Sequence, residues 1–464
     1  MAKARTVREL RESGYRSRSV KQELRDNLIA RLRGGQAIFR GIVGYEDSVI
    51  PQIENAILSG QDIVFLGERG QAKTRMARLL VGLLDEEIPA LAGSEINDDP
   101  LAPISPAARA LLAERGDDAP IVWIPRDRRY GEKLATPDIT IADLIGEVDP
   151  IKVAEGRYLA DELTIHYGLL PRTNRGIFAL NELPDLAERI QVGLLNIMEE
   201  RDVQIRGYKI RLPLDVYVVA SANPEDYTNR GRIITPLKDR FGSQIRTHYP
   251  RRLDDEMAIM EAECTHFASD GVVSHAPDYM RQVVAELTHL ARKASEINQR
   301  SGVSVRVSIC NYENLMSNAL KRAIRLGEGD AAPRVSDLGA LVASTSGKIE
   351  LETLGETSED KVLSKLMQRA VLNVFNRRFK TAELEDVVKA FEGNLRLDAS
   401  DTMPAAGYVR QLGQVKGLEA AVAKLGASEP AAIASAVEFV LEGLHLSRKL
   451  NKDVQAGGAF RYRS

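Results

Sequence analysis

The sequence feature that most constrains the fold is a loop with the sequence Gly67-Glu68-Arg69-Gly70-Gln71-Ala72-Lys73-Thr74. The apolar run before it, 62–66, predicts a buried strand, and apolar side chains at helical spacing over 76–83 predict a helix after it. A strand, a glycine-containing loop and a helix form the setting of a phosphate-binding loop, whose backbone N–H groups and helix N-terminus hold phosphate oxygens. The alternative is an accidental glycine-containing turn.

Two side chains of this loop have the chemistry that a nucleoside triphosphate requires. Lys73 is placed to reach the β and γ phosphates, and the hydroxyl of Thr74 is placed to bind Mg²⁺. We therefore expect ATP and Mg²⁺ as cofactors. Ala72 stands where the general pattern has glycine, and its methyl group narrows the space beside the phosphates.

Four apolar runs, at 62–66, 121–124, 176–180 and 215–220, predict strands with helical stretches between them. Continuous apolar strands separated by helices predict a mostly parallel sheet covered on both faces, which is an α/β domain. We place this nucleotide-binding domain at 38–250. Helical spacing then predominates, which predicts an all-helical lid domain at 251–395 and a helical C-terminal extension at 396–464. The predicted helices after 250 are 252–267, 278–297, 310–326, 358–379, 381–391 and 431–450.

The leader, 1–37, is rich in Arg and Lys. An arm that binds nucleic acid is one interpretation. Acidic residues are interleaved with the basic ones, which favours a solvated helix instead. These acidic residues are Glu9, Glu12, Glu23 and Asp26.

The strand predicted at 176–180 ends in Asn181 and Glu182. Glu182 is the candidate general base, because a carboxylate at this place accepts a proton from the attacking water. Asn181 is the candidate residue for the Mg²⁺ shell, since its carbonyl oxygen accepts a hydrogen bond from a metal-bound water but carries no negative charge. The alternative is a strand that simply ends in polar residues.

Three further residues are candidates for contact with the γ phosphate. Asn223 follows the strand predicted at 215–220 and is placed to orient the attacking water, although Asn-Pro is also a common turn. The guanidinium groups of Arg240 and Arg306 are candidates to stabilise charge on the phosphate. For each arginine alone, a solvated position or a surface ion pair is the alternative.

Several motifs in chain order resemble those of AAA+ ATPases of the group that contains the MoxR proteins and the ATPase subunit of magnesium chelatase. The resemblance covers roughly residues 38–325 and includes the Ala72-Lys73 form of the loop. The other matching stretches are Ile42-Val43-Gly44-Tyr45-Glu46, Gly146-Glu147-Val148-Asp149, residues 168–176, a hairpin at 202–211, Asn223-Pro224 and Asp239-Arg240-Phe241-Gly242.

This resemblance implies specific roles. Val43 and Gly44 contact the adenine, Asn223 is the sensor 1 residue, Arg240 is an arginine finger and Arg306 is the sensor 2 arginine. It also implies ATP hydrolysis in a homo-oligomeric ring, six subunits being the expected number, and a partner with a von Willebrand A domain. Asn181 departs from the family's Asp, so we expect slower hydrolysis.

Three functions are compatible with these motifs. The first is an ATPase that remodels a partner protein, the second the ATPase subunit of a magnesium chelatase, and the third an ATP-gated scaffold with little hydrolysis, which Asn181 suggests. The formal net charge is only −3, which argues against a dedicated nucleic-acid or membrane-surface protein. Two cysteines, no bilayer-length apolar run and no apolar leader predict a cytoplasmic protein.

Overall fold

The computed structural model describes residues 3–148, 165–200, 202–204, 211–223, 231–265, 271–299, 302–352, 358–393, 395–455 and 459–464. The chain divides into two compact units, Met1–His248 and Tyr249–Ser464. The first unit contains the phosphate-loop segment and the parallel strands, and the second is mainly helical. The finer division into leader, lid and extension stays a prediction.

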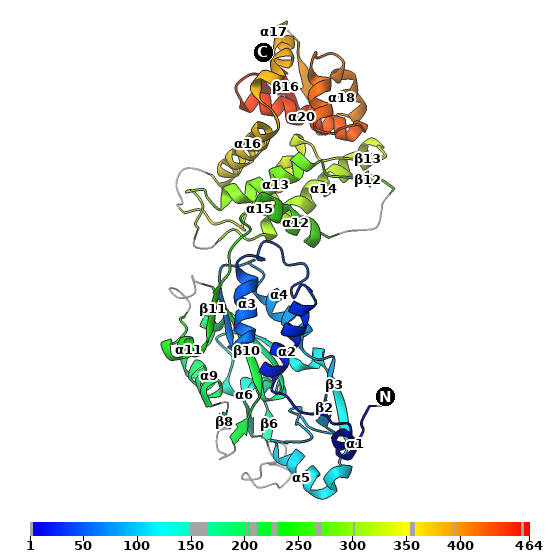
Figure 1. Cartoon of the computed structure of the whole chain (residues 1–464). Coiled ribbons are helices and arrows are strands. Elements are labelled where there is room, and N and C mark those ends of the chain that lie inside the picture. Colours follow the sequence, from blue (N-terminus) through cyan, green and yellow to red (C-terminus); the bar gives the residue numbers. More distant parts are fainter. Residues whose placement is uncertain are drawn as a thin grey trace. The chain divides into compact units, whose positions relative to one another are not determined.

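The first unit is built on a five-stranded sheet with the order β11-β1-β10-β7-β4, and every neighbouring pair is parallel. Three of the predicted strands form its centre, so the predicted parallel α/β sheet is confirmed (Figure 1). Because all the strands are parallel, their carboxyl ends lie along one edge. The strands are β1 (Ile63–Leu66), β4 (Tyr130–Leu134), β7 (Gly176–Asn181), β10 (Val216–Ala222) and β11 (Ser243–Arg246).

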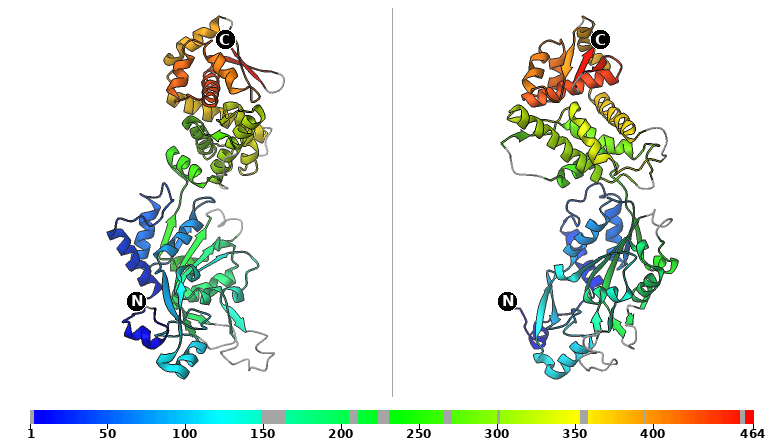
Figure 2. Two further views of the ribbon diagram at one scale, coloured as in Figure 1. Left: turned by 90° about the vertical axis from the view of Figure 1, so that its right-hand side faces the viewer. Right: turned by 180° about the vertical axis from the view of Figure 1, so that it is seen from behind.

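Both faces of this sheet are buried. Ile63, Ile177 and Val219 pack into one apolar core, and the adjacent residues Val64 and Phe178 pack into another. Such alternation explains why the central strands read as continuous apolar runs. Figure 2 shows helices on both sides of the sheet. The first core includes residues of α2 (Val20–Arg33), α3 (Val49–Leu58) and α4 (Lys73–Leu79), and the second includes residues of α6 (Ile141–Leu144), α8 (Leu169–Arg172), α9 (Glu188–Glu200) and α11 (Thr235–Arg240).

The strand predicted at 121–124 forms, but it does not belong to the parallel sheet. As β3 (Ile121–Pro125) it pairs antiparallel with β2 (Glu87–Leu91). The place beside β7 is taken by β4, with the sequence Tyr-Gly-Glu-Lys-Leu, which has no apolar run. The two outer strands escaped prediction because edge strands carry polar and charged residues. The remaining elements of this unit are α1 (Val7–Glu12), α5 (Pro106–Arg115), β5 (Gly146–Val148), β6 (Ile165–Tyr167), β8 (Asp202–Gln204) and β9 (Arg211–Pro213).

The prediction of a solvated leader helix is wrong for α2. Val20, Leu24 and Leu28 of this helix are fully buried in the core that also contains the central strands. Three apolar residues at four-residue spacing suffice to bury one stripe of the helix, although its overall composition is polar. The backbone N–H of Val20 also donates to the carboxylate of Asp215, just before β10, at 2.7 Å.

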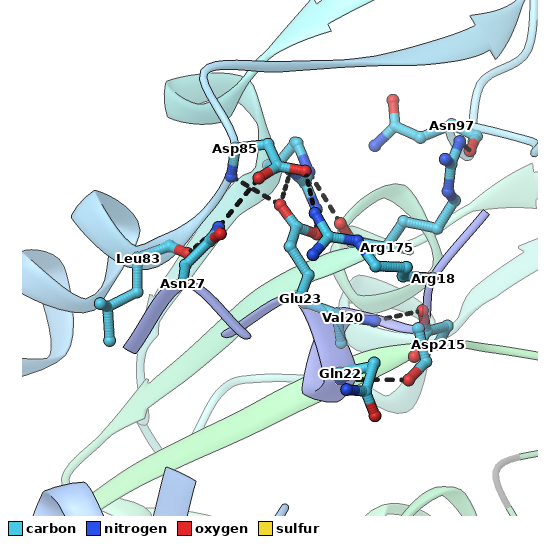
Figure 3. A network of polar contacts seen from close by, with 12 residues as sticks. Arg18, Val20, Gln22, Glu23, Asn27, Leu83, Asp85, Asn97, Arg175 and Asp215 are labelled. Atoms are coloured by element: carbon cyan, nitrogen blue, oxygen red, sulfur yellow. Dashed lines mark hydrogen bonds and ion pairs between the residues drawn. The ribbon is translucent and has the colours of Figure 1, made fainter. Parts of the chain in front are cut away.

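The charged residue Glu23 lies on the buried side of α2 and is only 3% exposed. Its two carboxylate oxygens accept hydrogen bonds from Arg129, at 2.8 and 2.6 Å, and one of them accepts from the backbone N–H of Asp85 at 2.6 Å. Asn27, one turn further along α2, donates to Asp85 and to the carbonyl of Leu83 (Figure 3). A buried two-point ion pair therefore fastens the leader to the α/β unit.

The second unit has helices where the sequence predicts them. The predicted lid is not all-helical, because β12 (Val273–Ser274) pairs in parallel with β13 (Asp330–Ala331). The predicted C-terminal extension contains a small sheet that the sequence did not reveal. Its three strands, in the order β14-β16-β15, are antiparallel. Across the part of the chain that the structure describes, no helix is long and apolar enough to cross a membrane. The elements are α12 (Leu253–Glu263), β12 (Val273–Ser274), α13 (Asp278–Ala291), α14 (Arg306–Leu326), β13 (Asp330–Ala331), α15 (Leu341–Thr345), α16 (Glu359–Arg378), α17 (Glu385–Glu392), β14 (Leu397–Ala399), α18 (Ala405–Leu412), α19 (Leu418–Lys424), α20 (Pro430–Leu446), β15 (Asn451–Val454) and β16 (Phe460–Arg463).

Substitution Glu23→Ala is expected to lower the free energy of unfolding of the first unit by about 3–5 kcal/mol, because it leaves the Arg129 charge buried and unpaired. Urea unfolding followed by fluorescence of the single tryptophan, Trp123, measures this change. The exposed Glu12→Ala is the control and should change stability by less than about 0.5 kcal/mol. A loss below about 1 kcal/mol for Glu23→Ala would show that the pair does not fasten the leader.

Candidate functional site

The phosphate-loop segment connects β1 to α4, as the sequence predicts, and its first glycine is sterically required. A Cβ atom on Gly67 would lie 1.9 Å from Oγ1 of Thr247 and 2.3 Å from Oε1 of Gln71. Both distances are far below van der Waals contact, so no side chain fits here. Thr247 follows the edge strand β11 and donates to Gln71 at 2.6 Å. The loop is therefore packed closely against the end of a neighbouring strand.

Ala72 adopts a left-handed backbone conformation, with φ 56° and ψ 16°, directly before the first residue of α4. Glycine adopts this conformation without steric cost, whereas a Cβ atom makes it unfavourable by about 1–2 kcal/mol. The sequence suggested that the alanine methyl group narrows the phosphate site. The structure shows in addition that the methyl group strains the backbone of the loop.

Lys73 is buried, and its ammonium group is held by the loop itself. Its Nζ donates to the backbone carbonyl of Gly67 and to that of Glu68, the latter at 2.9 Å. Phosphate oxygens carry full negative charge and are stronger acceptors than these carbonyls. The ammonium group is thus already inside the loop, where a phosphate would compete for it.

The predicted metal-binding residues meet. The hydroxyl of Thr74, at the start of α4, donates to Oδ1 of Asn181, at the end of β7, at 3.2 Å. Ser221 in β10 also donates to this oxygen, at 3.3 Å. Hydroxyl and amide oxygens are hard ligands, and Mg²⁺ typically takes few protein ligands besides phosphates and water, so this pair fits Mg²⁺. Among the described residues no group of three or more His, Cys, Asp or Glu is suited to hold a metal.

A carboxylate that the sequence reasoning missed borders the same pair. Oε1 of Glu132, on β4, accepts from Nδ2 of Asn181 at 2.9 Å. Arg78 and Tyr130 also donate to the Glu132 carboxylate. The hydrogen bond from Arg78 is the main reason that the pKa of Glu132 lies below its usual range, so the group is ionised at neutral pH. No motif marks Glu132, because it lies on the unpredicted strand β4.

Glu182, the candidate base, follows Asn181 in a left-handed conformation, with φ 54° and ψ 49°. Its backbone N–H donates to Oγ of Ser221 at 3.2 Å, and its side chain is partly exposed. A non-glycine residue in this region is strained by about 1–3 kcal/mol, and such strain is concentrated at functional sites. The sharp turn ends β7 and starts the short helix Leu183–Asp185.

Asn223, the candidate sensor, is 2% exposed and directly follows β10. The preceding residue, Ala222, pairs with Leu66 in the sheet, and its carbonyl accepts the N–H of Gly67 at 3.1 Å. The chain of Asn223 therefore lies beside the first residue of the loop. Pro224, like Asp149 and residues 205–210 of the expected hairpin, lies outside the described residues.

The segment expected to contact adenine is joined to the loop through its neighbour Tyr45. The hydroxyl of Tyr45 lies 3.0 Å from the carbonyl oxygen of Gln71 and 2.7 Å from that of His248. Burial raises the pKa of Tyr45 to about 12, so the hydroxyl stays protonated and donates. This contact keeps Val43 and Gly44, the latter at φ 82°, near the loop.

A cavity of about 360 Å³ borders the loop at Gly67, Glu68 and Gln71. This volume is within the range of small-molecule sites. Two basic side chains, Lys238 and Arg246, help to line it, which suits an anionic ligand. The sequence reasoning missed both, since isolated basic residues in a helix and an edge strand carry no motif.

The two candidate arginines lie on α11 of the first unit and on α14 of the second unit. Arg240, the last residue of α11, forms a 2.6 Å ion pair with Glu199 of α9 and a 3.3 Å pair with Asp239. Arg306 is exposed and is the first residue of α14 in the second unit. The roles assigned to these two arginines stay predictions.

Asn174 and Arg175, in the stretch 168–176 that carries part of the resemblance, form hydrogen bonds within the first unit. Asn174 donates to the carbonyl of Ile96 at 3.0 Å and accepts the N–H of Asp215 at 2.9 Å. Arg175 donates to the carbonyl of Pro89 at 2.7 Å. These residues join the turn before β7 to strand β2 and to the segments that contain Ile96 and Asp215.

Part of the chain is similar to a sigma-54 interaction domain and to two curated transcriptional activators. A model of the sigma-54 interaction domain matches residues 155–240, which include Glu182, Asn223 and Arg240 but not the phosphate loop. The sigma-54-dependent transcriptional activator SfnR of Pseudomonas putida is 28% identical over 181 residues, 35% of this chain and 49% of that protein. The acetoin dehydrogenase operon transcriptional activator AcoR of Bacillus subtilis is 26% identical over 97 residues, 21% of this chain and 16% of that protein. The matched part is thus about half of SfnR and less of AcoR.

Solved structures with similarity to the chain include a putative ATPase from Cytophaga hutchinsonii, with 16% identity and a TM-score of 0.32 over 78% of this chain and 98% of that one. NtrX from Brucella abortus has 15% identity and a TM-score of 0.43, and the match covers 83% of this chain and 72% of that chain. A chain in a complex of the magnesium chelatase subunits BchI and BchD has 20% identity and a TM-score of 0.36, and the match covers 69% of this chain and 98% of that chain. Likenesses at this level carry no information on function. The sheet order and the position of the loop after β1 are those of the expected AAA+ fold.

Substitution Ala72→Gly is expected to raise the free energy of unfolding by up to about 1 kcal/mol, the relief of left-handed strain less the entropy that glycine adds to the unfolded chain. Ala72→Val should lower it, because a β-branched residue is a severe outlier in this conformation. The measurement is urea unfolding followed by Trp123 fluorescence.

The matched control is Ala77→Gly inside α4, where glycine should cost about 1 kcal/mol. Equal destabilisation by Ala72→Gly and Ala77→Gly would contradict the strained conformation of Ala72.

Proposed function

We propose that this chain is an ATPase that couples ATP binding and hydrolysis to remodelling of a partner protein. The observation that carries the proposal is the 3.2 Å hydrogen bond between Thr74 and Asn181. It joins the helix after the phosphate loop to the strand end that carries Glu182. The residues for phosphate binding and for metal binding therefore lie close in space to the strand end that carries the candidate base.

Each of these residues has a defined task when Mg²⁺ and ATP bind. Lys73 exchanges the carbonyls of Gly67 and Glu68 for phosphate oxygens. Thr74 and Asn181 would hold the metal and its water, and Mg²⁺ would supply positive charge that neutralises the phosphates. Glu182 accepts a proton from the attacking water, and its strained turn fixes the direction of the carboxylate. Asn223, beside the start of the loop, orients that water.

We further propose that the site is completed by a neighbouring subunit in a ring, six being the expected number. Arg240 would then exchange its surface ion pair with Glu199 for the γ phosphate of the neighbour, where a guanidinium accelerates hydrolysis by several orders of magnitude. Arg306, at the start of α14, is the proposed sensor 2 arginine. The resemblance to MoxR proteins supports a partner with a von Willebrand A domain.

Two alternatives differ in the step after nucleotide binding. An ATP-gated scaffold with little hydrolysis is favoured by Asn181, since an amide lacks the charge of the family's Asp. A magnesium chelatase subunit is favoured by the motifs, whereas the Ala72 form of the loop and the C-terminal extension beyond the resemblance argue against it. Measured ATP turnover separates the first alternative from the proposal, and a porphyrin metal-insertion assay separates the second.

Substitution Lys73→Ala is expected to weaken ATP binding by at least about tenfold in calorimetry, because a buried ammonium partner of the phosphates is lost. Glu182→Gln should keep binding and lose turnover by about 100-fold or more, because an amide accepts no proton. The exposed Lys416→Ala in the second unit is the control. Unchanged ATP affinity in Lys73→Ala, or parent turnover in Glu182→Gln, would contradict these roles.

Substitution Arg240→Ala is expected to keep ATP binding and lose turnover by about 10³-fold or more. Mixing it with Glu182→Gln should restore part of the turnover, because a mixed interface pairs an intact Glu182 with an intact Arg240. Glu199→Ala is the matched control, since it breaks the same ion pair but leaves the guanidinium, and its turnover should persist. If Glu199→Ala is as inactive as Arg240→Ala, or if mixed rings form and stay inactive, the shared site is wrong.

A further inference from the structure

Glu132, which no sequence motif marks, is connected to the pair of residues expected to hold Mg²⁺. A continuous chain of hydrogen bonds runs from Thr74 through the Asn181 amide to the Glu132 carboxylate, with lengths of 3.2 and 2.9 Å. The three residues come from α4, β7 and β4. Strand β4 pairs with β7 so that Leu134 faces Asn181, which brings Glu132 alongside the strand end.

Glu132 decides which way the Asn181 amide points. An ionised carboxylate only accepts hydrogen bonds, so the NH₂ group of Asn181 must face it and the amide oxygen must face the other way. The hydroxyls of Thr74 and Ser221 both donate and accept, so neither of them fixes the amide orientation. With Glu132 in place, Oδ1 is aimed at Thr74, where the metal and its water are expected.

Glu132 also supplies the negative charge that Asn181 lacks. An amide that donates to a carboxylate is polarised, and its oxygen becomes a better acceptor. An aspartate in place of Asn181 would instead set a second carboxylate against Glu132, and like charges in contact repel. Asn181 and Glu132 therefore divide two tasks between them. The Asn181 amide provides the ligand oxygen, and the Glu132 carboxylate on β4 provides the negative charge.

Two further contacts hold this carboxylate in place. Arg78, on the helix that begins at the loop, donates to both oxygens of Glu132 at 2.7 and 2.9 Å, and Tyr130 donates at 3.0 Å. The Arg78 side chain is 64% exposed, so its charge is screened by water, whereas the Glu132 side chain is only 21% exposed. The carboxylate is thus fixed at the site by partners on α4 and β4.

We propose that Glu132 is a positioning residue that orients the Asn181 amide toward Mg²⁺ and provides the charge of the missing aspartate. The inference rests on the proposed function, because it assumes that Mg²⁺ and ATP bind at Thr74 and Asn181. Partners that hold metal ligands in place typically change metal affinity by about 10–100-fold when they are removed.

The test is the Mg²⁺ concentration that gives half-maximal binding of a fluorescent, non-hydrolysable ATP analogue to the full chain. Glu132→Gln is expected to raise this concentration about tenfold or more, and to leave the affinity for the analogue without Mg²⁺ within about twofold. Asn181→Asp alone should give little gain, because the new carboxylate faces Glu132. The double variant Glu132→Gln with Asn181→Asp should require no more Mg²⁺ than the parent.

The decisive outcome is that Glu132→Gln changes the Mg²⁺ requirement in opposite directions in the two backgrounds. The same Glu132→Gln change should harm Mg²⁺ binding in the parent background and improve it in the Asn181→Asp background, which a purely structural role of Glu132 would not produce. Equal effects of Glu132→Gln in both backgrounds would overturn the inference. If the parent chain does not bind the analogue, or binds it without regard to Mg²⁺, the proposed function itself fails. Tyr130→Phe, which removes one bond to Glu132 but not the one from Asn181, is the control and should change the Mg²⁺ requirement less than about threefold.

Discussion

The parallel pairing of β1 with β10 and of β10 with β7 is the constraint on which the candidate site depends. It places the phosphate loop, Asn181 and Asn223 at one edge of the sheet, although about a hundred residues separate the loop from Asn181. Helices cover both faces of these strands, so their buried backbone groups must find hydrogen-bond partners within the unit. The hydrogen bond from Thr74 to Asn181 is the chemical consequence of this arrangement.

The leader is attached to the same central strands. The carboxylate of Asp62, just before β1, accepts from the backbone of Val218 in β10 and from Lys21 in α2, both at 2.9 Å. Together with the buried pair of Glu23 and Arg129, this contact ties the leader to the strands that carry the site. Lys21 and Glu23 of this polar helix therefore have specific partners within the first unit.

The sequence predicted the place of a candidate site residue in the fold where that residue follows an apolar run. Gly67 to Thr74 follow such a run, and so do Asn181 and Glu182, because the strands before them are buried on both faces. Glu132 could not be predicted, since β4 is an edge strand whose polar residues hide its pairing with β7. The left-handed backbone of Ala72 and the burial of Glu23 were also hidden, because both depend on neighbours far away in the chain. Roles assigned to Arg240 and Arg306 stay predictions.

The central claim is that the loop, Thr74 and Asn181 form one site for Mg²⁺ and ATP. An experimental structure of the chain with a non-hydrolysable ATP analogue and Mg²⁺ tests it most directly. The account predicts phosphates within the loop, the Lys73 ammonium turned from the carbonyls of Gly67 and Glu68 to phosphate oxygens, and the metal beside Thr74 and Asn181. A nucleotide bound elsewhere, or a Lys73 that keeps its carbonyl partners in the bound state, would contradict it.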